Sequence, residues 1–118
     1  MYWSIDSILS KLREALDLAN SVLAGETVAT LRSKELRIDY NDQWKQFAPA
    51  HPTGLRQDPF DASAAYLSLE ATMRHRTFEY TTHLFNIQRI KRAQGLRATV
   101  ELPTEGYMAL ASWDRSEP

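Results

Sequence analysis

The chain has 118 residues, of which 43% are hydrophobic and 25% charged, and its formal net charge at neutral pH is −1. This length and composition predict one globular domain over residues 1–118, with enough apolar side chains for a core. The chain has no cysteine, which excludes disulfides, thiolate metal sites and a cysteine nucleophile. Its apolar runs are far shorter than the ~20 residues of a membrane span, and its first residues lack the pattern of a cleaved signal. We therefore expect a soluble, cytoplasmic protein without membrane contact.

The N-terminal part of the sequence predicts a long amphipathic helix over residues 4–24. Apolar side chains recur at steps of three and four from Ile5 to Leu23, which places them on one helix face. Ser4 is a residue of the type that caps the free amides of a first turn. The apolar stripe is wide, which is typical of a helix packed on a core.

The region that follows predicts shorter elements. Apolar residues alternate with charged ones over residues 36–40, which predicts a half-buried strand. Asp42 is placed to cap a short helical turn. Residues 48–60 hold three prolines, whose fixed φ angles and missing amide donors predict a loop.

A second long helix is predicted over residues 62–94, with Asp61 at its start and Gly95 at its end. A break at residues 81–82, both of them threonine and weak helix formers, and a strand over 78–84 are the alternatives. Residues spaced at steps of three and four define the expected apolar face: Tyr66, Leu69, Met73, Thr77, Tyr80, Leu84 and Ile87.

Beyond Gly95 the hydrophobic period changes to two. Alternation over residues 96–102, a Pro- and Gly-containing turn, and a second apolar stretch over 107–113 predict a small C-terminal β-hairpin. The expected fold class is therefore α+β, with two main helices and this hairpin, which strand 36–40 can join. An all-α bundle is the alternative.

Residues 74–97 form a basic segment in an otherwise acidic chain. Six cationic side chains stand against one acid, Glu79, which gives the segment a formal charge of +5, whereas the parts before and after it are each at −3. Such asymmetry favours a polyanionic partner, most often nucleic acid. The cations are Arg74, Arg76, Arg89, Lys91, Arg92 and Arg97.

Aromatic rings lie among these cations on one face of the predicted helix. Phe78 and Phe85 share a sector with Arg74, Arg89 and Arg92. Cations bind phosphates, and exposed rings stack on unpaired bases. The alternative makes both phenylalanines core residues and the arginines a solvated rim. The predicted nucleic-acid-binding residues are Arg74, Arg76, Phe85, Arg89, Lys91, Arg92 and Arg97.

Arg76 and His83 also lie near one face of the predicted helix, about two turns apart. An arginine and a later histidine with six residues between them on a helix resemble the HEPN class of metal-independent RNases. The resemblance covers these two residues. It implies an all-helical fold in which the histidine and the arginine act on the 2′-hydroxyl and the phosphate at a dimer interface.

The sequence predicts no other catalytic, metal or cofactor site. His75 and His83 are eight residues apart and point in different directions, and His51 lies alone in the proline-rich loop. The four glycines are isolated, so no phosphate-cradling loop is present.

We hypothesise a non-enzymatic accessory protein that binds nucleic acid or a nucleoprotein complex through residues 74–97. A small subunit or an inhibitor of an antiviral or phage-related machine is the setting this hypothesis suggests. The alternatives are a HEPN-like RNase and a pure protein–protein interaction module anchored by Trp3, Trp44 or Trp113. The sequence does not specify the oligomeric state.

Overall fold

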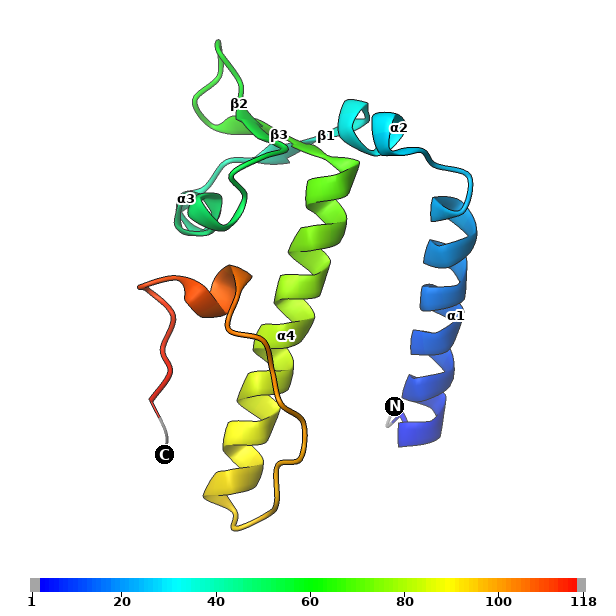
Figure 1. Ribbon diagram of the computed structural model, residues 1–118, viewed down its shortest axis with the longest axis vertical. Coiled ribbons are helices and arrows are strands. Elements are labelled where there is room, and N and C mark those ends of the chain that lie inside the picture. The colour runs from blue at the N-terminus through cyan, green and yellow to red at the C-terminus, as the bar shows by residue number, and fades with distance from the viewer. Residues whose placement is uncertain (1–2, 117–118) are drawn as a thin grey trace. The chain divides into compact units, whose positions relative to one another are not determined.

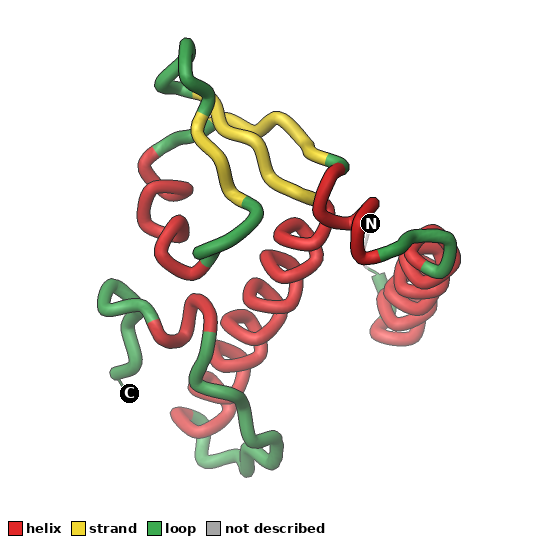
Figure 2. The backbone as a smooth tube through the Cα atoms, turned by 45° about the horizontal axis from the view of Figure 1, so that its top comes forward, coloured by secondary structure: helices red, strands yellow, loops and turns green. Residues whose placement is uncertain are grey.

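The computed structural model describes residues 3–116 and shows two compact units, one ending at Leu31 and the other beginning at Arg32. Helices occur together with a three-stranded antiparallel sheet (Figure 2). The predicted α+β class is therefore confirmed, and the all-α alternative is not supported. Within the described range, no helix has both the length and the apolar character needed to cross a bilayer.

The first unit contains α1 (Ile5–Leu23), the predicted N-terminal helix. Ser4 caps it as expected, because its side chain accepts a hydrogen bond from the amide of Ser7 at 3.1 Å. None of the α1 residues is buried, and seven of its large apolar side chains are 42–75% exposed. Among the described residues of the first unit, no surface covers this stripe. A wide stripe shows that a helix needs a partner surface, but it does not say which one.

The sheet of the second unit has the strand order β1-β3-β2, with β3 (Ala64–Ser68) between β1 (Glu35–Asp39) and β2 (Leu55–Gln57). All pairings are antiparallel, and Leu67 of β3 is opposite a leucine in each neighbour. Four of the five β3 residues are buried. The predicted strand 36–40 is confirmed as β1, whereas β2 lies inside the region expected to be a loop.

The second long helix begins later than predicted. Residues 64–68 form β3, and α4 (Leu69–Ala93) starts after Ser68, whose side chain accepts from the amide of Ala71 at 3.1 Å. The alanines and the leucine of β3 are good helix formers, but pairing with two strands overrides that weak preference. Asp61 does not start a helix. It accepts from the amide of Ser63 at 2.9 Å in the turn before β3.

α4 runs without a break through Thr81 and Thr82, so the alternatives of a break and of a strand are wrong. Both threonine hydroxyls donate to backbone carbonyls of the preceding turn, at 2.9 and 2.8 Å. Such bonds give the hydroxyl a partner inside a helix. Gly95 has a φ of 72° just beyond the helix, as expected for a left-handed stop.

The predicted C-terminal hairpin is wrong. Residues 96–105 form no strand, and a short 3-10 helix, η2 (Gly106–Ala109), follows. This extended segment returns along α4 (Figure 1), and the amide of Val100 donates to the side chain of Gln88 at 3.2 Å. Alternation shows that every second side chain faces a surface. Here Ala98 and Leu102 are half-buried, whereas Leu96 and Val100 are 54% and 53% exposed.

Two short helices complete the second unit beside η2. α3 (Asp42–Phe47) is capped by Asn41, whose side chain accepts from the amide of Trp44 at 3.0 Å, so the predicted cap at Asp42 is off by one residue. η1 (Ala48–Ala50) continues it and leads to His51. A further short helix, α2 (Val28–Ser33), precedes β1.

Candidate nucleic-acid interface

The predicted apolar face of α4 is only partly covered, with Leu69, Met73 and Leu84 half-buried. Tyr80 and Ile87, on the predicted apolar face, are 56% and 53% exposed. On the phenylalanine face, Phe78 packs against Tyr107 of η2 and Phe85 packs edgewise on Trp113, and both rings are half-buried. For Phe78 this is the core role that the sequence left open beside nucleic-acid binding.

At the N-terminal end of this face, Tyr107 joins two histidines that are far apart in the sequence. Its hydroxyl lies 2.7 Å from Nε2 of His51 and 2.5 Å from Nδ1 of His75. One ring nitrogen donates to the hydroxyl and the other accepts from it, since a phenol has one proton. Phe47 stacks on Tyr107 with ring centroids 4.1 Å apart. We call His51, His75 and Tyr107 the His–Tyr cluster.

Burial sets the protonation of the His–Tyr cluster. It lowers the pKa of His51 to about 4, and the charges of Arg74 and His75 act in the same direction. Burial also lowers the pKa of His75 and raises the pKa of the Tyr107 hydroxyl. Both histidines are therefore neutral at neutral pH. His51 is 3% and Tyr107 1% exposed, so a substrate has no access to them, and the arrangement holds the fold together.

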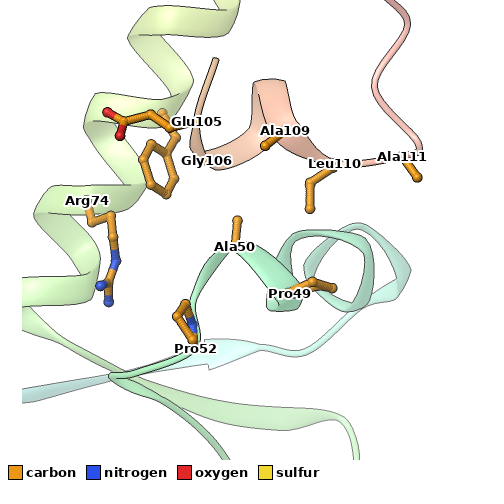
Figure 3. Close-up of a pocket in the computed structure, with 10 residues that line it drawn as sticks. Pro49, Ala50, Pro52, Arg74, Glu105, Gly106, Ala109, Leu110 and Ala111 are labelled. Atoms are coloured by element: carbon orange, nitrogen blue, oxygen red, sulfur yellow. The ribbon is translucent and has the colours of Figure 1, made fainter. Parts of the chain in front are cut away.

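Arg74 belongs to this end of the helix. Its Nη2 donates to the carbonyl of Thr53 at 2.6 Å, and the side chain borders a 620 Å³ pocket between η1 and η2 (Figure 3). The rest of that pocket is mostly apolar, with Ala50 and Leu110 on opposite walls. Arg74 thus links α4 to the loop that contains Thr53.

The C-terminal half of α4 borders a different depression, which we call the C-terminal groove. It has a volume of 250 Å³ and lies between α4 and the returning C-terminal segment. Two of the predicted binding residues, Phe85 and Arg92, line it together with an arginine from outside the basic segment. Among its lining residues are Phe85, Gln88, Arg92, Val100, Leu102 and Arg115.

Positive charge dominates this groove. The guanidinium of Arg89 lies 5.9 Å from the ring centre of Phe85 and 3.5 Å from a carboxylate oxygen of Asp114. Nε of Arg115 donates to the carbonyl of Met108 at 2.9 Å, which orients the side chain without neutralising it. No carboxylate of residues 3–116 lines the groove. Sequence reasoning missed Arg115 because it is a lone cation among acids, close to Phe85 only in the fold.

The other predicted cations lie outside the groove. Arg76 and Arg97 are exposed and Lys91 is half-buried. On the Arg76 side of the helix, His83 lies 3.4 Å from Glu79. As far as the structure describes the chain, no hydrogen bond or ion pair joins Arg76 to His83, so a single chain does not assemble the HEPN-like pair.

Residues 3–116 contain no cluster of three or more His, Asp or Glu side chains suited to a metal ion. Comparison with protein-family models finds no matching family, and comparisons with curated proteins and with solved structures find no significant match.

Proposed function

We propose that this protein binds single-stranded nucleic acid, with one base seated on Phe85 in the C-terminal groove and adjacent phosphates held by Arg92 and Arg115. The proposal depends on one observation: an aromatic ring and two arginines from separate parts of the chain line the same depression, with no carboxylate among its lining residues. A non-enzymatic binding role follows naturally, because the buried His–Tyr cluster offers a substrate no access.

The size and chemistry of the groove suit a base better than a duplex. Its 250 Å³ equals the volume of roughly eight liquid waters, the scale of one planar heterocycle. Stacking on an aromatic ring contributes about 1–3 kcal/mol per base and tolerates any sequence. The guanidinium of Arg89 lies over the Phe85 ring, 5.9 Å from its centre, and its charge adds attraction for a phosphate.

The remaining basic residues extend this surface. Arg92 follows Phe85 by seven residues, or about 10 Å along the helix axis, and Lys91 and Arg97 lie near the same helix end. A strand leaving the groove would pass these cations. Arg74 is far from this path, about 27 Å along α4 from Arg92, and contributes to the fold through Thr53.

Fluorescence anisotropy with labelled single- and double-stranded RNA and DNA over a salt series tests the proposal. Arg92→Ala with Arg115→Ala should weaken binding and flatten the salt slope by about 1.4, since each lost single-strand phosphate contact removes about 0.7. Phe85→Leu keeps apolar packing but removes the stacking surface, and it should lower single-strand affinity roughly 5- to 100-fold.

Lys45→Ala is the matched control. It removes one exposed cation on α3, where Lys45 pairs with Asp42, and it should bind nearly as the wild type does. A wild-type protein that binds none of the oligonucleotides at low salt would refute the proposal. Equal losses of affinity in Lys45→Ala and in the groove variants would show that the binding is nonspecific charge attraction.

A further inference from the structure

The apolar side chains of α1 follow a strict repeat of the kind that packs one helix against another. Along the helix, the steps between successive members alternate between four and three residues, the seam of a helix that packs against another helix. None of these side chains is buried. The members of the seam are Ile5, Leu9, Leu12, Leu16, Ala19 and Leu23.

We propose that two copies of this chain associate through α1, with the two helices antiparallel. In such a pair, the side chains that face each other are complementary in size along the whole length of the helices. When Leu12 faces Leu16 of the second copy, Ile5 faces Leu23 and Leu9 faces Ala19. Each facing pair therefore combines one member of the set Ile5, Leu12 and Ala19 with one member of the set Leu9, Leu16 and Leu23. A parallel pair would instead place Ala19 opposite itself and leave a void, which close-packed interfaces avoid.

The flanks of the seam also fit a second copy. One flank is apolar, with Ile8, Ala15 and Val22, and in the antiparallel pair Ile8 meets Val22 of the second copy while Ala15 meets its counterpart. The apolar surface therefore continues beyond the seam on that side. The dipoles of antiparallel helices also oppose each other, which favours this direction.

The available area sets the strength of the contact. Six large apolar side chains of α1 lie on the seam or its apolar flank, and they are 42–75% exposed: Ile5, Ile8, Leu9, Leu12, Leu16 and Val22. Their exposed area amounts to roughly 320 Å² per copy if a fully exposed aliphatic side chain presents about 100 Å². Two copies would bury about 640 Å² of apolar surface, or roughly 1,000 Å² in all at the usual apolar share of such contacts. That total is the lower limit for specific interfaces, so the dimer should dissociate on dilution.

Sedimentation of the full-length protein from about 5 to 500 µM tests this inference. The wild type should shift from monomer to dimer mass over that range. Leu12→Gln places a polar side chain of good helix propensity at the centre of the seam and should stay monomeric with unchanged helicity by circular dichroism. Ser21→Gln, on the opposite helix face, should dimerise as the wild type does.

The absence of native cysteine allows a test of direction. Under mild oxidation, Ala15→Cys should form a disulfide-linked dimer, because the two copies of this position meet near the centre of an antiparallel pair. Ile5→Cys should not, since the two sulfurs would be about 27 Å apart. A wild type that is monomeric at every concentration, or a Leu12→Gln variant that still dimerises, refutes the inference. Linkage of Ile5→Cys but not of Ala15→Cys refutes the antiparallel pair.

Discussion

Acidification should destabilise the second unit through His51 before the carboxylates titrate. His51 is 3% exposed, and its pKa is lowered to about 4 in the fold, against about 6.5 in an unfolded chain. Below pH 6.5, His51 therefore binds a proton in the unfolded state but not in the folded state. The stabilisation is complete above about pH 6.5, falls as the pH decreases, and has been lost once the pH reaches about 4.

The magnitude follows from these two pKa values. A difference of about 2.5 units corresponds to roughly 3 kcal/mol in full, and about 2 kcal/mol of this should be lost between pH 7 and pH 5. His75 contributes in the same direction, because burial lowers its pKa too. Hydrogen bonds lower the pKa values of carboxylates such as Asp58 and Asp61, so these groups act only in more acidic solution.

Urea unfolding at several pH values between 7 and 4.5 measures this effect. His51→Gln removes the titrating group, so its unfolding free energy should change by about 2 kcal/mol less than that of the wild type between pH 7 and pH 5. His83→Gln is the control, because His83 is exposed on α4, and it should follow the wild type. If His51→Gln shows the same pH dependence as the wild type, the assignment of a neutral, buried His51 is wrong.

Three further predictions concern η2, the groove and catalysis. Gly106 has a φ of 58°, and a Cβ atom there would meet the ring of Phe78, so Gly106→Ala should cost about 2–4 kcal/mol in urea unfolding. Gly95→Ala, at a φ of 72° in open space, should cost only about 1–2 kcal/mol, and equal costs would contradict the packing argument. Asp114→Asn should tighten single-strand binding a few-fold by releasing Arg89, whereas Asp17→Asn on α1 should not. Wild-type protein should leave single-stranded RNA intact without metal, and cleavage that disappears in His83→Ala would favour the HEPN-like RNase instead.

The sequence predicted the elements whose signal is local. The period of α1, the Ser4 cap, the alternation in β1 and the glycine that ends α4 each depend on a few neighbouring residues. The strand β3 was missed because its alanines and leucine also suit a helix, and only pairing with β1 and β2 decides between the two. The supposed hairpin failed for a related reason, since alternation cannot say whether a strand or a helix lies opposite.

The candidate site shows the same limit. The basic segment was visible as composition, yet its residues have separate roles in the fold: Arg74 binds Thr53, while Arg92 lines the groove. Arg115 and the His–Tyr cluster had no sequence signal, because their members are separated by tens of residues and meet only when the C-terminal segment returns along α4. Charge asymmetry can therefore indicate a class of partner without indicating which cations face it.

The His–Tyr cluster and the C-terminal groove are connected through η2, and this connection gives a last prediction. Tyr107 is held by the two histidines, and the next residue, Met108, lines the groove and accepts a hydrogen bond from Arg115. Protonation of His51 should loosen η2 at a lower free-energy cost than global unfolding, as local openings do, and so displace Arg115 from the groove.

Simple electrostatics predicts the opposite trend for binding. Arginine stays charged throughout this range, and protonation of His51 adds positive charge, so a rigid groove would bind oligonucleotides more tightly at pH 5 than at pH 7. If the cluster supports the groove, single-strand affinity should instead fall several-fold in the wild type over that interval, and less in His51→Gln. Anisotropy at constant ionic strength distinguishes the two. An affinity that rises equally in both proteins would show that the groove does not depend on the anchoring of η2.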